Sequence, residues 1–218
     1  MQLPANTAAL AGQAAAALYR CWWQEAETAT EAQGVEIHRL ALAGRQGEIA
    51  AEIADRLASR WINQSRFRDA TAACRKTLEV VEDYRIFHCL ARSERQLGEV
   101  GTAIRNYEQA LTICPDSDEK EKAAIIHNLA ELKTQQGEVE QAIALYQQSL
   151  ELKERIGDVQ GKAATLHCMA IIYAQQGEVE RAIALYQQSL ELQERIGNVQ
   201  GKAATLHQMA GIYAQQGE

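Results

Sequence analysis

Four histidines stand at equivalent places along the chain and are the first candidates for chemistry. Each follows a bulky apolar residue by one place, and the four are His88, His127, His167 and His207. Histidine titrates near neutrality and is the commonest metal ligand. Zinc ligands, however, must all lie within about 2.3 Å of one ion, whereas equivalent atoms of stacked helices lie about one helix diameter apart, ~10 Å. We therefore expect no metal site from these histidines.

Other motifs with catalytic potential lack essential residues. The segment from Gly157 to Ala163 resembles a phosphate-binding loop, but it has three residues between its glycines instead of four, and Ala163 stands where Ser or Thr is needed. Cys168 follows His167 directly, and adjacent residues on a helix point apart. We find no nucleophile elbow and no paired-carboxylate pocket. The sequence predicts a protein that is not an enzyme and needs no metal or cofactor.

The histidines belong to a unit that is repeated along the chain. The segment DVQGKAATLHCMAIIYAQQG (158–177) returns as NVQGKAATLHQMAGIYAQQG (198–217), and EVEQAIALYQQSLELKERIG (138–157) returns as EVERAIALYQQSLELQERIG (178–197). Apolar residues recur at the spacing of one helical face in both segments, and glycines such as Gly137 and Gly177 suit the left-handed conformation that ends a helix. Neither helix can bury its apolar face alone, so the units must stack.

The pattern resembles the tetratricopeptide repeat (TPR) family. The residues that carry it are Leu166, Met169, Ala170, Tyr173, Gly177, Ala182, Tyr186 and Ser189, and in an earlier unit Phe87, Leu90, Ala91, Gly98, Ala103, Tyr107, Ala110 and Pro115. The later units exceed the family's 34-residue period and are similar to repeats of bacterial signalling proteins and kinesin light chains. The resemblance implies an all-α fold, a right-handed α-solenoid of antiparallel helix pairs (TPR superhelix).

We divide the chain into an N-terminal helical capping or linker segment, 1–46, and a TPR array, 47–218. The array comprises repeats at about 47–83, 84–118, 119–157 and 158–197 and a half repeat at 198–218. We expect one long helix over 5–33, broken at Gly34, then a short helix as far as Gly44. Trp22 and Trp23 either close the core of the first repeat or form a docking surface.

The family resemblance also implies a concave groove that binds a partner. Its predicted lining is Arg85, His88, Arg92, Arg95, His127, Glu131, His167, Ile171 and His207, with Ala164, Ala174 and Gln175 among the long repeats. The arginines either grip an acidic peptide or are solvated. Chaperone-binding members of the family clamp the terminal carboxylates of a peptide with Lys and Asn at set places. In this sequence a His stands in the place of the first Lys, and Arg92 or Glu131 in the place of the first Asn. We therefore do not expect specificity for such a terminus. The histidines form a ladder that bonds neighbouring repeats, contact a ligand, or make the groove sensitive to pH.

Composition narrows the class of protein. The net charge of −7 argues against nucleic acid, whose phosphates require a basic surface. Five cysteines at irregular spacings favour buried, reduced thiols in a cytoplasmic protein. The apolar start of the chain has no basic segment before it and is too short to cross a bilayer, so no membrane partner is expected.

Two functions remain open. The first is a non-catalytic protein–protein interaction scaffold that binds a peptide or protein segment. The repeats are similar to the sensor arrays of bacterial STAND-type signalling ATPases, which implies a sensor or regulatory fragment of a larger signalling protein. The alternative is a structural module that forms homo-oligomers through its solenoid ends, because the apolar face of the last helix, including Leu206 and Met209, is only half covered.

Overall fold

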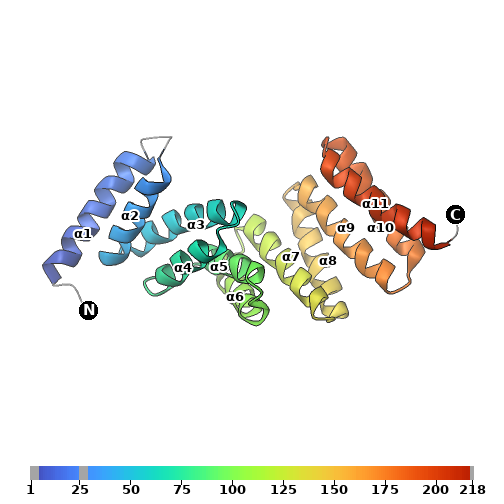
Figure 1. Ribbon diagram of the computed structural model, residues 1–218, viewed down its shortest axis with the longest axis horizontal. Coiled ribbons are helices and arrows are strands. Elements are labelled where there is room, and N and C mark those ends of the chain that lie inside the picture. Colours follow the sequence, from blue (N-terminus) through green and yellow to red (C-terminus); the bar gives the residue numbers. More distant parts are fainter. Residues whose placement is uncertain (1–4, 25–28, 217–218) are drawn as a thin grey trace. The chain divides into compact units, whose positions relative to one another are not determined.

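The computed structural model describes residues 5–24 and 29–216. These residues form eleven α-helices and one π-helical segment, and they contain no β-strand (Figure 1). The predicted all-α fold is confirmed. No helix within the described ranges has both the length and the apolar character needed to cross a membrane. The helices fall into two compact units, Met1–Ile113 and Cys114–Glu218.

The first unit contains six α-helices and the π-helical segment. In order they are α1 (Ala5–Leu18), the π-helical segment (Tyr19–Gln24), α2 (Glu31–Ala43), α3 (Gly47–Asn63), α4 (Phe67–Leu78), α5 (Tyr84–Gln96) and α6 (Val100–Ile113). Each helix packs against the next, and α3 also packs against α5. The first unit is therefore a stack of helix pairs in chain order.

The second unit contains five helices of nearly equal length. They are α7 (Glu119–Gln135), α8 (Val139–Arg155), α9 (Val159–Gln175), α10 (Val179–Arg195) and α11 (Val199–Gln216). The antiparallel pairs α7–α8 and α9–α10 make the largest contacts, and the first helices α7, α9 and α11 also contact one another in sequence (Figure 1). We call α7, α9 and α11 the A helices, and α8 and α10 the B helices.

A tyrosine of each of the helices α6, α8 and α10 lies in the core. Tyr107 is fully buried, and Tyr146 and Tyr186 are 2% and 1% exposed. Small residues surround them: Ala142 and Ala182 are fully buried on the B helices, and Ala170 is fully buried on α9. Alanine at these places lets two helix backbones approach closely while a tyrosine fills the space beside them.

The helix ends follow the turn chemistry expected from the sequence. Gly137 and Gly177 have positive φ angles of 78° and 79°, and Ser65, which replaces the glycine in an earlier repeat, also has a positive φ, of 61°. Asp118 caps α7, since its side chain accepts a hydrogen bond from the backbone N–H of Glu121 at 3.1 Å. These contacts are local, which is why the sequence could predict them.

The prediction of one helix over 5–33 with a break at Gly34 is wrong. The chain leaves the α-helical pattern after Leu18, and α2 begins after Thr30. Thr30 and Gln33 form a capping box, in which the backbone N–H of each residue donates to the side chain of the other, at 2.8 and 3.3 Å. Gly34 lies inside α2, where a Cβ would come within 3.2 Å of the Trp23 ring and 3.3 Å of Leu57.

Trp22, Trp23 and the five cysteines of the chain occupy mixed environments. Trp22 and Trp23 are half-buried and pack against the core of the first unit, as the capping interpretation expects. The guanidinium of Arg56 lies 5.2 Å from the centre of the Trp23 ring. Cys74, Cys89 and Cys114 are buried thiols, Cys168 is half-buried and Cys21 is exposed. The expectation that the cysteines are buried is therefore correct for only some of them.

Ala182→Leu tests the close approach of the helices in the second unit. Because Ala182 is fully buried beside Tyr186, three extra carbon atoms have no space, and we expect a loss of about 1–3 kcal/mol in the free energy of unfolding. The loss is measured from urea denaturation curves that are monitored by circular dichroism. Ala184→Leu is the matched control, since Ala184 is exposed on the same helix, and equal stability of the two variants would refute the assignment.

Candidate functional site

The predicted groove residues divide between the two units. Four lie on α5 of the first unit: Arg85, His88, Arg92 and Arg95. Five lie on the A helices of the second unit: His127 and Glu131 on α7, His167 and Ile171 on α9, and His207 on α11. Each group is therefore a separate surface with its own chemistry.

Arg85 and His88 on α5 are held by contacts within the first unit. Arg85 donates from Nη2 to Asp83 Oδ2 at 2.7 Å and from Nε to Asp83 Oδ1 at 3.1 Å, and these bonds raise the pKa of the guanidinium. His88 is 5% exposed, and its ring centre lies 5.8 Å from that of Tyr107. Arg92 and Arg95 are half-exposed, so a partner can reach the exposed part of each side chain.

In the second unit His127 and His167 each lie against the tyrosine of their own helix pair. The ring centres of His127 and Tyr146 are 5.4 Å apart with an interplanar angle of 67°, and those of His167 and Tyr186 are 5.4 Å apart at 66°. This edge-to-face arrangement is the favoured geometry of aromatic pairs. The tyrosine therefore fixes the height and direction of each imidazole on its A helix.

The same histidines bond the next repeat. His127 Nδ1 lies 3.2 Å from Thr165 Oγ1, and His167 Nδ1 lies 3.0 Å from Thr205 Oγ1. Each bond joins one A helix to the following one, α7 to α9 and α9 to α11. The ladder interpretation of the histidine column is confirmed for these two residues. His207, the last of the column, is exposed.

The partners of Thr165 decide which nitrogen of His127 carries the proton. Thr165 Oγ1 donates to the carbonyl oxygen of Gly161 at 2.9 Å and accepts from Lys153 Nζ at 2.8 Å. A hydroxyl has one proton and two lone pairs. Because its proton points at Gly161, Thr165 must accept from His127, so His127 carries its proton on Nδ1 and presents the lone pair of Nε2 on the other side.

A buried polar side chain of the B helix completes each step of the ladder. Lys153 is 6% exposed, and burial lowers the pKa of its ammonium group. Gln193 takes its place in the next repeat, where Nε2 donates to Thr205 Oγ1 at 3.1 Å and to Ser189 Oγ at 2.9 Å. The ammonium group of Lys153 and the neutral amide of Gln193 therefore make the same contact, because each donates a hydrogen bond to the threonine hydroxyl of its repeat.

Three pockets lie along the A helices of the second unit. The first, about 410 Å³, is lined by residues that include Lys120, Asn128 and Ala164. The second, about 260 Å³, shares Ala164 and reaches His167. The third, about 480 Å³, is lined by Ile171, Ala174, Gln175, Val179, Tyr186, Gln208, Gly211 and Ile212. We call these lining residues of α7, α9 and α11 the A-helix surface.

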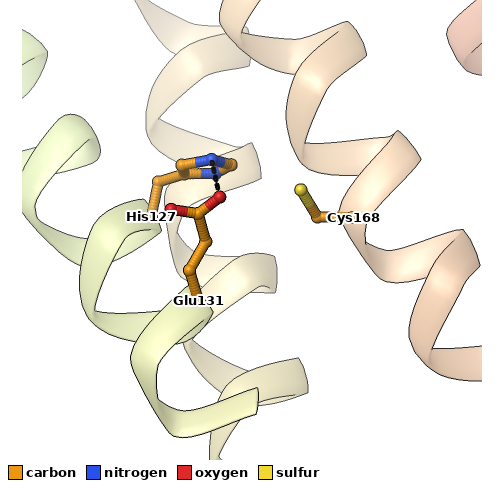
Figure 2. Close-up of side chains that lie close together, drawn as sticks. All are labelled: His127, Glu131 and Cys168. Atoms are coloured by element: carbon orange, nitrogen blue, oxygen red, sulfur yellow. Dashed lines mark ion pairs between the residues drawn. The ribbon is translucent and has the colours of Figure 1, made fainter. Parts of the chain in front are cut away.

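One cluster of possible metal ligands lies beside the second pocket. Nε2 or Nδ1 of His127, a carboxylate oxygen of Glu131 and the sulfur of Cys168 lie within 4.8 Å of one another, and all three side chains are half-buried (Figure 2). Equivalent histidines of neighbouring repeats are too far apart to share one ion. This cluster contains one histidine, and its other two donors come from the next turn of α7 and from the neighbouring helix α9.

Sequence reasoning did not identify Thr165, Lys153 or Cys168 as parts of this site. A usable signal existed for the threonine, because Thr165 and Thr205 each stand two places before a histidine in the two closest copies. The position of Cys168 opposite Glu131 depends on how α9 is rotated against α7. That rotation cannot be predicted from the residue pattern of one helix, because it depends on how two helix surfaces pack together.

The chain belongs to the tetratricopeptide repeat family. The model of that family matches residues 82–155 and 161–218, which is more than half of the chain. No curated protein matches the sequence at a significant level.

Solved structures of similar fold include three named proteins. MamA is 16% identical, with a TM-score of 0.56 over 74% of this chain and 92% of MamA. BtubC (BKLC) from P. vanneervenii is 19% identical, with a TM-score of 0.58 over 97% of this chain and 91% of that chain. Aspartyl phosphate phosphatase F from Bacillus subtilis is 14% identical, with a TM-score of 0.67 over 91% of this chain and 52% of that chain. At these identities the likeness shows the fold.

Thr165→Val tests the ladder. The valine keeps the shape but leaves Lys153 and His127 without their shared acceptor, and we expect a loss of about 1–3 kcal/mol in the free energy of unfolding. Thr165→Ser keeps the hydroxyl and removes one methyl group, at about 0.8 kcal/mol. Urea denaturation should therefore rank the serine variant above the valine variant, and the reverse order would show that the hydroxyl contributes no net stability.

Proposed function

We propose that this chain binds a peptide or protein segment along the A-helix surface of its second unit. Its membership of the tetratricopeptide repeat family supports a role as a protein–protein interaction scaffold. The observation that carries the proposal is the row of three pockets along α7, α9 and α11, two of which share Ala164. A row of small pockets along successive helices suits a segment whose side chains enter them one after another.

The lining of the pockets indicates the chemistry of the segment. Alanines leave space above the helices, and amide side chains such as Gln160, Gln175 and Gln208 line the pockets. An amide both donates and accepts hydrogen bonds, so it can satisfy the backbone N–H and C=O groups of an extended peptide, each of which needs a partner when covered. Charged groups of both signs, including Lys120 and Glu121, line the first pocket, whereas Glu131 contributes a single negative charge to the second and the lining residues of the third are uncharged. We therefore propose a segment that is mainly polar and uncharged.

We also propose that binding serves a sensor or regulatory role within a signalling protein. The long repeats that resemble the sensor arrays of STAND-type ATPases support this role. The half-exposed Arg92 and Arg95 on α5 of the first unit offer a second contact to an acidic part of the same partner, and Arg92→Glu would remove it.

A matched pair of substitutions tests the binding surface. Peptides selected from a random display library against the full chain serve as probes, and fluorescence anisotropy measures their affinity. Ala164 is exposed and lines two pockets, so Ala164→Arg should fill them and weaken binding at least tenfold. Ala184 is exposed on the B helix α10, and Ala184→Arg should leave the affinity unchanged. Equal effects of the two variants would place the binding site elsewhere.

A second candidate function is self-association through α11. Leu206 is 43% exposed and Val199 is 78% exposed, although Leu166, the counterpart of Leu206 in the preceding repeat, is 2% exposed. Leu166 is covered because α9 packs closely against α10, the B helix that follows it. Within the described residues, the main contacts of α11 are with the helices that precede it, α10 and α9. A second copy of the chain would cover this apolar face.

Light scattering coupled to size-exclusion chromatography tests self-association. If the face of α11 joins two copies, the wild-type chain should have twice the mass of a monomer at high concentration, and Leu206→Lys should restore the monomer because a lysine charge is costly to bury. His207→Lys, which adds the same charge at the exposed neighbouring position, is the control. A wild-type monomer at every concentration would exclude this function.

A further inference from the structure

We propose that His127, Glu131 and Cys168 form a binding site for one divalent transition-metal ion, with Zn²⁺ as the best chemical match. The three side chains supply one nitrogen, one oxygen and one sulfur donor. Zn²⁺ accepts all three donor types and commonly takes three protein ligands with a fourth, open position. This proposal does not rest on the peptide-binding function, although the three ligands also line one of the three pockets.

The distances between the donor atoms fit the sharing of one ion. His127 Nε2 and Glu131 Oε1 are 4.0 Å apart (Figure 2), which is too long for a hydrogen bond. Two ligands of a tetrahedral zinc ion lie about 3.5 Å apart, given bond lengths of about 2.0–2.3 Å. All three donors already lie within 4.8 Å of one another. Glu131 has three rotatable side-chain bonds, so a small rotation brings its carboxylate into place.

The ladder prepares His127 as a ligand. Its Nδ1–H donates to Thr165 Oγ1, whose own proton is held by Gly161, and the lone pair of Nε2 therefore faces Glu131 and Cys168. Metal-binding histidines almost always donate their second ring N–H in this way, because the bond fixes the tautomer and the orientation of the ring. The tilted packing of the ring on Tyr146 fixes it further.

The second helix of the pair supports the sulfur ligand. The Tyr146 side chain hydrogen-bonds with the side chains of Thr134 and Cys168, and a phenol that donates to sulfur stabilises a thiolate. When the metal binds, the S–H bond of Cys168 breaks, its proton passes to solvent, and the sulfur electron pair forms the bond to the metal. No oxidant or reductant takes part.

The charges around the cluster balance when a dication is bound. Glu131 and the Cys168 thiolate together contribute −2, which a divalent ion neutralises. Lys153 is a neighbouring cation: its ammonium group is hydrogen-bonded to Thr165 Oγ1 and interacts favourably with Asp158 and also with Cys168 and Glu131, so it supports their negative charge without being a ligand. The cluster borders the pocket of about 260 Å³, through which the ion enters and from which a water molecule can fill the fourth position.

The neighbouring interface provides an internal comparison. His167 also bonds the next threonine and also lies on a tyrosine. The places of Glu131 and Cys168 are taken there by Ile171 and Gln208, so the carboxylate and the thiol are absent although the scaffold is the same. The three donors are therefore a property of one interface and not a by-product of the repeat, and one ion per chain is expected.

Titration of the metal-free full chain with Co²⁺ tests the site. Co²⁺ replaces Zn²⁺ in tetrahedral sites and gives a thiolate-to-metal charge-transfer absorption together with visible bands. We expect one equivalent to produce both and Zn²⁺ to abolish them by displacement. Cys168→Ser should remove the charge-transfer band, and Glu131→Gln should weaken Co²⁺ binding at least tenfold. Both positions are half-buried, and circular dichroism confirms that the variants fold.

Cys21→Ser is the control for adventitious binding, because Cys21 is the exposed thiol of the chain. This variant should keep the full spectrum and the stoichiometry of one. The proposal is overturned if the charge-transfer band is absent from the wild-type chain, if it persists in Cys168→Ser, or if Cys21→Ser removes it. Each of these outcomes leaves the peptide-binding measurements unaffected, so the two proposals fail separately.

Discussion

The burial of one tyrosine in each helix pair is the constraint on which the second unit depends. Tyr146 and Tyr186 come from B helices, and each fills the space between its own A helix and the next repeat. A tyrosine buries a large apolar area, but two helices alone cannot enclose it. Stacking is therefore a requirement of folding, and the small residues Ala142 and Ala182 are the places where the backbones approach to achieve it.

Polar contacts between repeats add alignment to this apolar packing. A threonine hydroxyl bonds a histidine of the preceding A helix and accepts from a B-helix side chain of the preceding pair, Lys153 in one repeat and Gln193 in the next. Buried polar groups stabilise a fold only when their hydrogen bonds are made. A stack displaced by one residue would lose these bonds, so the ladder favours a single alignment of neighbouring helices.

The repeats separate positions that build the stack from positions that vary on its surface. The tyrosine, the histidine and the alanine that make the inter-helix contacts are the same in the two closest copies. Between the interface of α7 with α9 and that of α9 with α11, the side chains four places after the first histidine and one place after the second differ: Glu131 is replaced by Ile171, and Cys168 by Gln208. The chemical differences between the repeats are concentrated at such positions. Both the proposed peptide surface and the proposed metal site draw on them, while the constant residues hold them in place.

The sequence by itself determined the helix pairs and their ends. Apolar spacing, the Asp118 cap and the glycine at Gly137 act within a few residues, so their effects can be read along the chain. The same reasoning failed at Gly34, whose lack of a side chain serves contact with Trp23 and Leu57 and does not end a helix.

Only the tertiary structure decided which side chains meet between repeats. His127 and Thr165 are 38 residues apart, and Cys168 reaches Glu131 from a different helix. Their meeting depends on the rotation and the shift of α9 against α7, which result from the fit of many apolar side chains at once. Such a fit is a property of two surfaces in contact and is not contained in the periodicity of either helix.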